Sequence, residues 1–373
     1  MFPAPSIPSL AQGTIVADLR VVRCLGAEPG WIYYAAEREG DRLPVVMQEI
    51  FPLGSASREG TLVCPHATRQ QPCQEMLQTA RHTGALLAKV NHRHVWKLRR
   101  TLEANATLYF IFDWMDGPNL AQRLRLLGRP ATPVEAGILL DQVLSAAEAL
   151  HAAGLVHGSL EPERILMRRG EEPVIGGFKW FRQGSGGVTA APSGYASLEA
   201  DTLTNHLPAS CDVYSLAAVI YTAITGQIPP APQVRQLPAS DPCPAVLHRL
   251  QGTFPPRFLS ALTAAFQPRA ADRLPDIAAW RQSLAAPSGS AAVANGQTSP
   301  ANRPPPPLTA QKRSRSVWGR LALAGLLGLA GWQSWKYFSQ PAVPPAAHPP
   351  LPTTSQVQAP PAGTMPEVGP SIP

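Results

Sequence analysis

The chain has 373 residues, of which 45% are hydrophobic, so it can form one large domain or two smaller ones with a sizeable core. Only 15% of the residues are charged, which excludes a highly charged nucleic-acid binder, and no nucleic-acid partner is expected. Part of the net charge of +7 is a local basic cluster within residues 312–320. Cys64, His66 and Cys73 lack the spacing of a zinc site, so no bound metal is expected.

Strand patterns come first along the chain. They predict strands at residues 19–24 and 31–35, on either side of a glycine-containing loop at 25–30, and further strands at 45–49 and 108–112. These short strands indicate a small β-rich lobe at the N-terminal side.

Helix patterns follow. Thr132 and Glu135 form a capping-box pattern with proline at the first turn, and Gly154 marks the end of this helix. Residues 212–224 are apolar nearly all round, which predicts a buried helix. Strands first and helices afterwards predict an α+β domain with two lobes over residues 14–286.

Three segments after this domain differ in composition. Residues 287–316 are rich in Pro, Ser and Ala and are predicted to be a linker, and the Pro-rich residues 339–373 a disordered tail. Between them, residues 317–338 predict one transmembrane helix, since a bilayer core takes about 20 helical residues. The alternative is a buried or surface-lying amphipathic helix. Basic residues precede this segment, so we expect the N-terminal domain in the cytoplasm and the tail outside the cell membrane.

One segment, residues 150–166, reads LHAAGLVHGSLEPERIL and resembles the catalytic loop H-R-D-L-x-x-x-N of protein kinases. His157 and Leu160 stand at matching positions. Further matching segments follow in the right order: LG at 25–26, VVMQE at 45–49, FDWMDG at 112–117, SLE at 197–199 and DVYSL at 212–216. Residues 14–286 therefore resemble the eukaryotic-type Ser/Thr protein kinases of bacteria. The resemblance implies a bilobal kinase-like fold and a buried ion pair between Glu199 and Arg273.

The same resemblance locates five positions where the chemistry of the family is missing. Gln48 replaces the lysine that grips the phosphates, and Thr83 replaces its glutamate partner. Ser159 stands at the position of the base, and Arg164 and Gly177 stand where the family has its two metal ligands. These changes predict a pseudokinase with no catalytic residue, no metal and no bound cofactor.

Two alternatives stay open. Glu161 or Glu163 could serve as the base of a weakly active or atypical Ser/Thr protein kinase that transfers phosphate from ATP to protein. Alternatively, Arg164 and Lys179 could contact an anion and hold ATP or another nucleotide without metal. Against this second alternative stand Gln48, the carboxylate of Glu28 in the glycine-containing loop, and Phe112 at the hinge entrance. Both cations could also point into solvent or pair with Glu161 and Glu163.

The predicted function is a membrane-anchored pseudokinase in signalling. It would bind protein partners through the kinase-like domain, as a docking or regulatory module, and the membrane through residues 317–338. A third hypothesis makes the tail, residues 339–373, the working part.

Overall fold

The computed structural model describes residues 7–285, apart from residues 29, 170, 179–192, 202–206 and 238. The chain separates into two units, Met1–Val293 and Ala294–Pro373, and every described residue lies in the first. The predicted linker (287–316), membrane span (317–338) and tail (339–373) lie outside the described residues. Within the part that is described, no helix has both the length and the apolar character needed to cross a bilayer.

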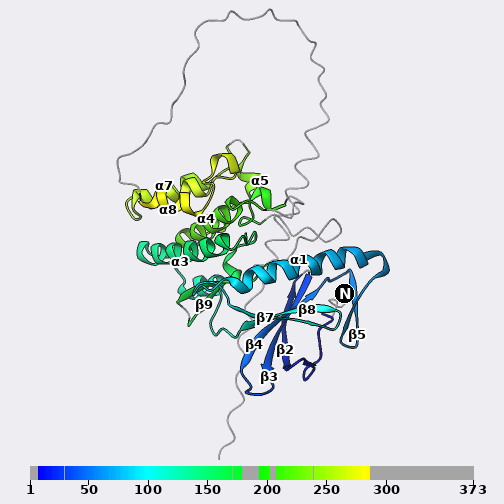
Figure 1. Ribbon diagram of the computed structural model, residues 1–373. Coiled ribbons are helices and arrows are strands. Elements are labelled where there is room, and N and C mark those ends of the chain that lie inside the picture. Colours follow the sequence, from blue (N-terminus) through cyan, green and yellow to red (C-terminus); the bar gives the residue numbers. More distant parts are fainter. Residues whose placement is uncertain are drawn as a thin grey trace, which may run out of the picture. The chain divides into compact units, whose positions relative to one another are not determined.

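The first unit has a small lobe built on a six-stranded antiparallel sheet (Figure 1). In spatial order its strands are β1 (Ile15–Val16), β2 (Leu19–Glu28), β3 (Gly30–Arg38), β4 (Pro44–Phe51), β8 (Thr107–Asp113) and β7 (Leu98–Ala104). Alternation of side chains along these strands gives the sheet two apolar faces. Trp31, Val46 and Phe110 join the large core that continues into the helical lobe, whereas Tyr34 and Met47 belong to a second, smaller core.

A different element packs against each face of the sheet. Helix α1 (Gln70–Lys89) follows the short 3-10 helix η1 (Ala67–Arg69) and lies along the face of the large core (Figure 1). Gly84 allows this close approach, because a Cβ there would lie 2.5 Å from the ring of Phe110. The opposite face packs against the hairpin of β5 (Ala56–Glu59) and β6 (Leu62–Pro65), which contributes Ala56 and Val63 to the second core.

A buried carboxylate organises this second core. Glu49 is fully buried, and its two oxygens accept hydrogen bonds from the hydroxyls of Tyr34 (2.7 Å) and Tyr109 (2.9 Å). Arg58 pairs with Glu49 at 2.5 Å and also donates to the carbonyl of Pro8 at 2.6 Å. The buried charge is therefore paired and hydrogen-bonded, as burial of a charge requires, and the N-terminal segment is fastened to the sheet.

The second lobe is helical (Figure 1). It contains α2 (Leu120–Leu127), α3 (Pro133–Ala152), α4 (Ser210–Thr225), α5 (Pro232–Arg235), α6 (Cys243–His248), α7 (Pro256–Ala265) and α8 (Ile277–Ala285), the hairpin of β9 (Ile165–Arg168) and β10 (Glu172–Ile175), and the 3-10 helices η2 (Pro162–Arg164), η3 (Leu198–Asp201) and η4 (Ala270–Asp272). The predicted capping box is present, since Thr132 Oγ1 accepts from the backbone N–H of Glu135 and the Glu135 side chain accepts from that of Thr132. Helix α4 is buried along nearly its whole length, as its sequence predicts.

Candidate functional site

Arg164 lies at the centre of the region where the two lobes meet. It ends the turn η2, and its side chain is 9% exposed. Its Nε donates to Glu161 (2.9 Å), its Nη1 to the backbone carbonyl of Gly177 (2.7 Å) and its Nη2 to Glu28 (2.8 Å). The two predicted metal-ligand positions, Arg164 and Gly177, are thus in direct contact, and a guanidinium lies between them.

The charges around Arg164 explain why it remains ionised. Burial by itself lowers the pKa of the Arg164 guanidinium, but the carboxylates of Glu28 and Glu161 outweigh burial, and the net shift is upward. Two acidic groups therefore face one cation. The expectation that Arg164 pairs with Glu161 is confirmed, whereas its second partner is Glu28 from the small lobe and not Glu163.

Gly177 packs closely against the side chain of Arg164. Its φ of +63° is left-handed, and a Cβ there would lie 3.1 Å from both Cγ and Nη1 of Arg164. A side chain at position 177 would meet strain and crowding together. The guanidinium of Arg164 therefore takes up space that an aspartate at position 177 would need.

These positions do not suit the divalent metal that the resemblance implies. Magnesium prefers oxygen ligands, and here the two positions supply a cation and a glycine without a side chain. The nearby carboxylates of Glu28 and Glu161 are both bonded to Arg164. No cluster of three or more His, Cys, Asp or Glu side chains that could hold a metal occurs among the described residues.

Gln48 lies on β4 and faces the side of the sheet that carries the large core. It is 1% exposed, and its Nε2 donates to the hydroxyl of Tyr33 on β3 at 3.4 Å. Burial raises the pKa of Tyr33, and the negative charge of Glu28 raises it further, so the phenol stays neutral. The position of the phosphate-gripping lysine therefore holds an uncharged amide beside an uncharged phenol.

Thr83 lies on α1 and is half-buried. It directly precedes Gly84, where the helix contacts Phe110, and Phe110 pairs with Gln48 in the sheet. Position 83 on this helix therefore carries a short hydroxyl side chain, where the resemblance places a glutamate.

The loop that contains the base position is held by Asp212 at the start of α4. This fully buried carboxylate accepts from the backbone N–H groups of His157 and Gly158 (both 2.8 Å) and from His151 Nε2 (2.9 Å). Burial raises the pKa of Asp212, but the hydrogen bond and charge of His151 outweigh it, and the pKa is lowered. The Oγ of Ser159 is buried and has no hydrogen-bond partner in the described part of the chain.

His157 has a packing role. Its Nε2 is 2.9 Å from the carbonyl oxygen of Gly176, and its ring lies 4.9 Å from that of Phe178. Further along the chain, Arg273 pairs with Glu199 at 3.2 Å, which confirms the predicted ion pair. The scaffold of the helical lobe is therefore held together around the loop that carries Ser159.

The remaining predicted features have different outcomes. Lys179 lies outside the described residues, so the predicted pair of cations is not seen together. Phe112 packs inside the small lobe, with its ring stacked on Trp96 at 4.5 Å. Reasoning from sequence missed the contact between Arg164 and Glu28 and the part played by Tyr33. The only signal for the contact was the presence of opposite charges at two positions that the family keeps for phosphate and metal.

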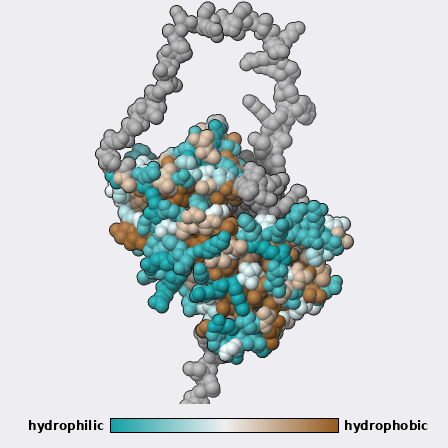
Figure 2. Space-filling model, viewed as in Figure 1, coloured by the Kyte–Doolittle hydropathy of each residue, from teal (hydrophilic) through white to brown (hydrophobic). Residues whose placement is uncertain are grey.

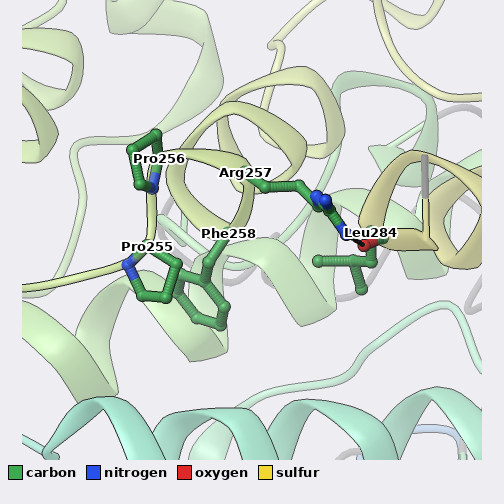
Figure 3. Close-up of a pocket in the computed structure, with 5 residues that line it drawn as sticks. All are labelled: Pro255, Pro256, Arg257, Phe258 and Leu284. Carbon is green, nitrogen blue, oxygen red and sulfur yellow. Dashed lines mark hydrogen bonds between the residues drawn. The ribbon is translucent and has the colours of Figure 1, made fainter. Parts of the chain in front are cut away.

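A separate hollow lies on the helical lobe (Figure 3). It has a volume of about 300 Å³ and is lined by Pro255, Pro256, Arg257, Phe258 and Leu284. Arg257 Nη1 donates to the carbonyl of Leu284 at 3.1 Å across it, which links α7 to α8. These elements carry none of the predicted site residues.

Known proteins support the kinase assignment of the central segment. The family model of the protein kinase domain matches residues 61–242. The serine/threonine-protein kinase PkaA of Streptomyces coelicolor is 31% identical over 153 residues, which are 39% of this chain and 28% of PkaA. CBL-interacting protein kinase 30 of Oryza sativa is 26% identical over 151 residues, which are 39% of this chain and 32% of that protein. The chain thus spans less than half the length of the curated relatives it matches.

Solved structures agree with the fold. PpkA-294 in its apo form aligns with a TM-score of 0.60 and 22% identity, over 74% of this chain and 100% of that chain. The kinase domain of Mycobacterium tuberculosis PknI aligns with a TM-score of 0.53 and 20% identity, over 74% of this chain and 98% of that chain. The segment 61–242 is thus similar to the protein kinase domain, and the predicted bilobal kinase-like fold is confirmed.

Proposed function

We propose that this protein is a pseudokinase, in which a kinase-like domain acts as a docking or regulatory module and does not transfer phosphate. The observation that carries the proposal is the position of Arg164 between Glu28, Glu161 and the carbonyl of Gly177. Phosphoryl transfer depends on positioning and on neutralising the charge of the nucleotide with metal ions. Among the described residues, the two metal positions offer no ligand oxygen from a side chain, and the charge of Arg164 is already paired.

The retained contacts support a role that depends on shape. Asp212, His157 and the Glu199–Arg273 pair hold the helical lobe in its kinase-like form, although the loop they hold has Ser159 at the base position. On the face shown in Figure 2, hydrophobic residues form separate patches among hydrophilic ones. A surface of this kind suits a protein partner that binds reversibly.

The test is a phosphotransfer assay on the purified full-length chain with Mg-ATP or Mn-ATP and a generic acceptor protein. We expect no labelling above the background of a reaction without the chain. Ser159→Ala and Glu161→Gln are the matched controls, because they remove the hydroxyl at the base position and the nearest carboxylate that could replace it. Labelling by the wild type that either substitution abolishes would show a weakly active or atypical Ser/Thr kinase.

Anchoring in the cell membrane by residues 317–338, with the kinase-like domain on the cytoplasmic side, belongs to the same proposal. Its support is the apolar sequence between flanking basic residues. Extraction of cell membranes with carbonate should leave the full-length chain in the pellet and release a chain that lacks residues 317–338. Affinity capture from these membranes, compared with a chain that lacks residues 339–373, would separate partners of the kinase-like domain from those of the tail.

A further inference from the structure

The ion pair between Glu28 and Arg164 joins the two lobes. Glu28 is the last residue of β2 in the small lobe, and Arg164 ends η2 in the helical lobe. Their side chains meet with Oε2 and Nη2 2.8 Å apart, although the residues are 136 positions apart in sequence. This contact crosses the region where a kinase holds the phosphates of its nucleotide.

Glu28 differs from the other two partners of Arg164. Glu161 lies three residues before Arg164 on the same turn, and the Gly177 partner is a backbone carbonyl. Glu28 is the charged partner that comes from the small lobe, and its side chain is 38% exposed, so it can be withdrawn or exchanged. A guanidinium binds carboxylate and phosphate oxygens with the same planar geometry. The carboxylate of Glu28 therefore stands where a phosphate oxygen would bind Arg164.

The local charge explains why no anion would displace it. Arg164 contributes one positive charge, and Glu28 and Glu161 contribute two negative charges, so the cluster repels a phosphate. Without Glu28 the cluster would be neutral, and Nη2 of Arg164 would lose its carboxylate partner. The neutral phenol of Tyr33 contacts Arg164, and the neutral amide of Gln48 contacts Tyr33.

We propose that Glu28 is a built-in ligand of Arg164 that closes the cleft to phosphate anions, and that Arg164 binds a polyphosphate without metal once this carboxylate is removed. The inference rests on the proposed pseudokinase function and deepens it, because it states what fills the cleft in place of a nucleotide. The contact between Glu28 and Arg164 thus blocks an anion site, and the ligands of this site would be polyphosphates.

The experiment measures binding of inorganic tripolyphosphate and of ATP to the full-length chain in excess EDTA, by calorimetry and by thermal shift. The wild type is expected to show no shift at millimolar ligand. Glu28→Gln is expected to bind tripolyphosphate at least about tenfold more tightly than the wild type, and ATP similarly, since the phosphates supply the recognition. Adenosine should not bind detectably to either protein.

Three further variants make the result specific. Glu161→Gln changes the net charge by the same amount but leaves Glu28 on the guanidinium, so its gain in tripolyphosphate binding should be clearly smaller than that of Glu28→Gln. Glu28→Gln combined with Arg164→Gln should lose the gained binding. Glu28→Ala repeats the test with a different side chain, and a single cooperative thermal transition identifies the folded variants.

Several results would overturn the inference. These are tripolyphosphate binding by the wild type as tight as that of the variants, no gain in either folded Glu28 variant, an equal gain in Glu161→Gln, or a gain that survives loss of Arg164. The proposed function fails separately, through phosphoryl transfer by the wild type in Mg-ATP. A chain that neither transfers phosphate nor gains binding on loss of Glu28 would contradict the blocked anion site alone.

Discussion

Replacing Gly177 by alanine tests whether Arg164 fills the space of the missing aspartate. The left-handed φ of +63° should cost an L residue about 1–2 kcal/mol. The new Cβ would also lie 3.1 Å from two atoms of Arg164, and such overpacking typically costs about 1–3 kcal/mol. We expect Gly177→Ala to lower the free energy of unfolding by about 2–5 kcal/mol in total.

The assay is urea denaturation of the full-length chain, with a glycine of similar conformation as the control. Gly154 has φ +79°, but a Cβ there would meet nothing within 4 Å, so Gly154→Ala should cost only the backbone strain of about 1–2 kcal/mol. A double-mutant cycle of Gly177→Ala with Arg164→Ala isolates the contact, and we expect the cost of the new Cβ to shrink when Arg164 is absent.

The reasoning is refuted if Gly177→Ala costs no more than Gly154→Ala. It also fails if the interaction energy between the changes at positions 177 and 164 is below about 0.5 kcal/mol, the level of independent sites. Either result would mean that the guanidinium does not crowd position 177.

Two more predictions concern buried carboxylates. Asp212→Asn should destabilise the chain by about 3 kcal/mol, because it weakens charged hydrogen bonds to two backbone N–H groups and to His151, and denaturation at pH 7 measures this. The folded pKa of Asp212 is below its unfolded value, so its stabilisation is present above the unfolded pKa and is lost as pH falls through the folded one. Stability of Asp212→Asn should therefore fall less on acidification than that of the wild type, and an equally steep fall would contradict the assignment. Glu49→Gln should cost about 3–5 kcal/mol, because it leaves the Arg58 charge buried without its partner. Denaturation measures this as well, with the exposed pair partner Glu39→Gln as a control expected to cost under about 1 kcal/mol.

Much of the fold could be predicted because its signals are local. Four consecutive residues, Thr132 to Glu135, form the capping box that predicts the start of α3. The burial of α4 follows from its apolar composition. The Glu199–Arg273 pair was predicted only through the resemblance to a family, since 74 residues separate its partners. Local patterns thus predicted the elements, and the resemblance predicted how some of them meet.

The contacts of the site could not be read in the same way. Glu28 was expected to repel phosphate, and the sequence gives no distance between its carboxylate and Arg164. That distance depends on how β2 and η2 meet after folding. The second core on the outer face of the sheet was missed as well, because it depends on the position of the β5–β6 hairpin, and Glu49 shows no local sign of its buried partners.

The crowding at position 177 couples this position to position 164. A change at either of the two positions, 164 or 177, affects the residues around the other. Aspartate at position 177 would crowd the side chain of Arg164. Loss of Arg164 would leave the carboxylates of Glu28 and Glu161 without the cation that they share. The two positions are therefore coupled, and a variant that changes both together would avoid the crowding and the unpaired carboxylates.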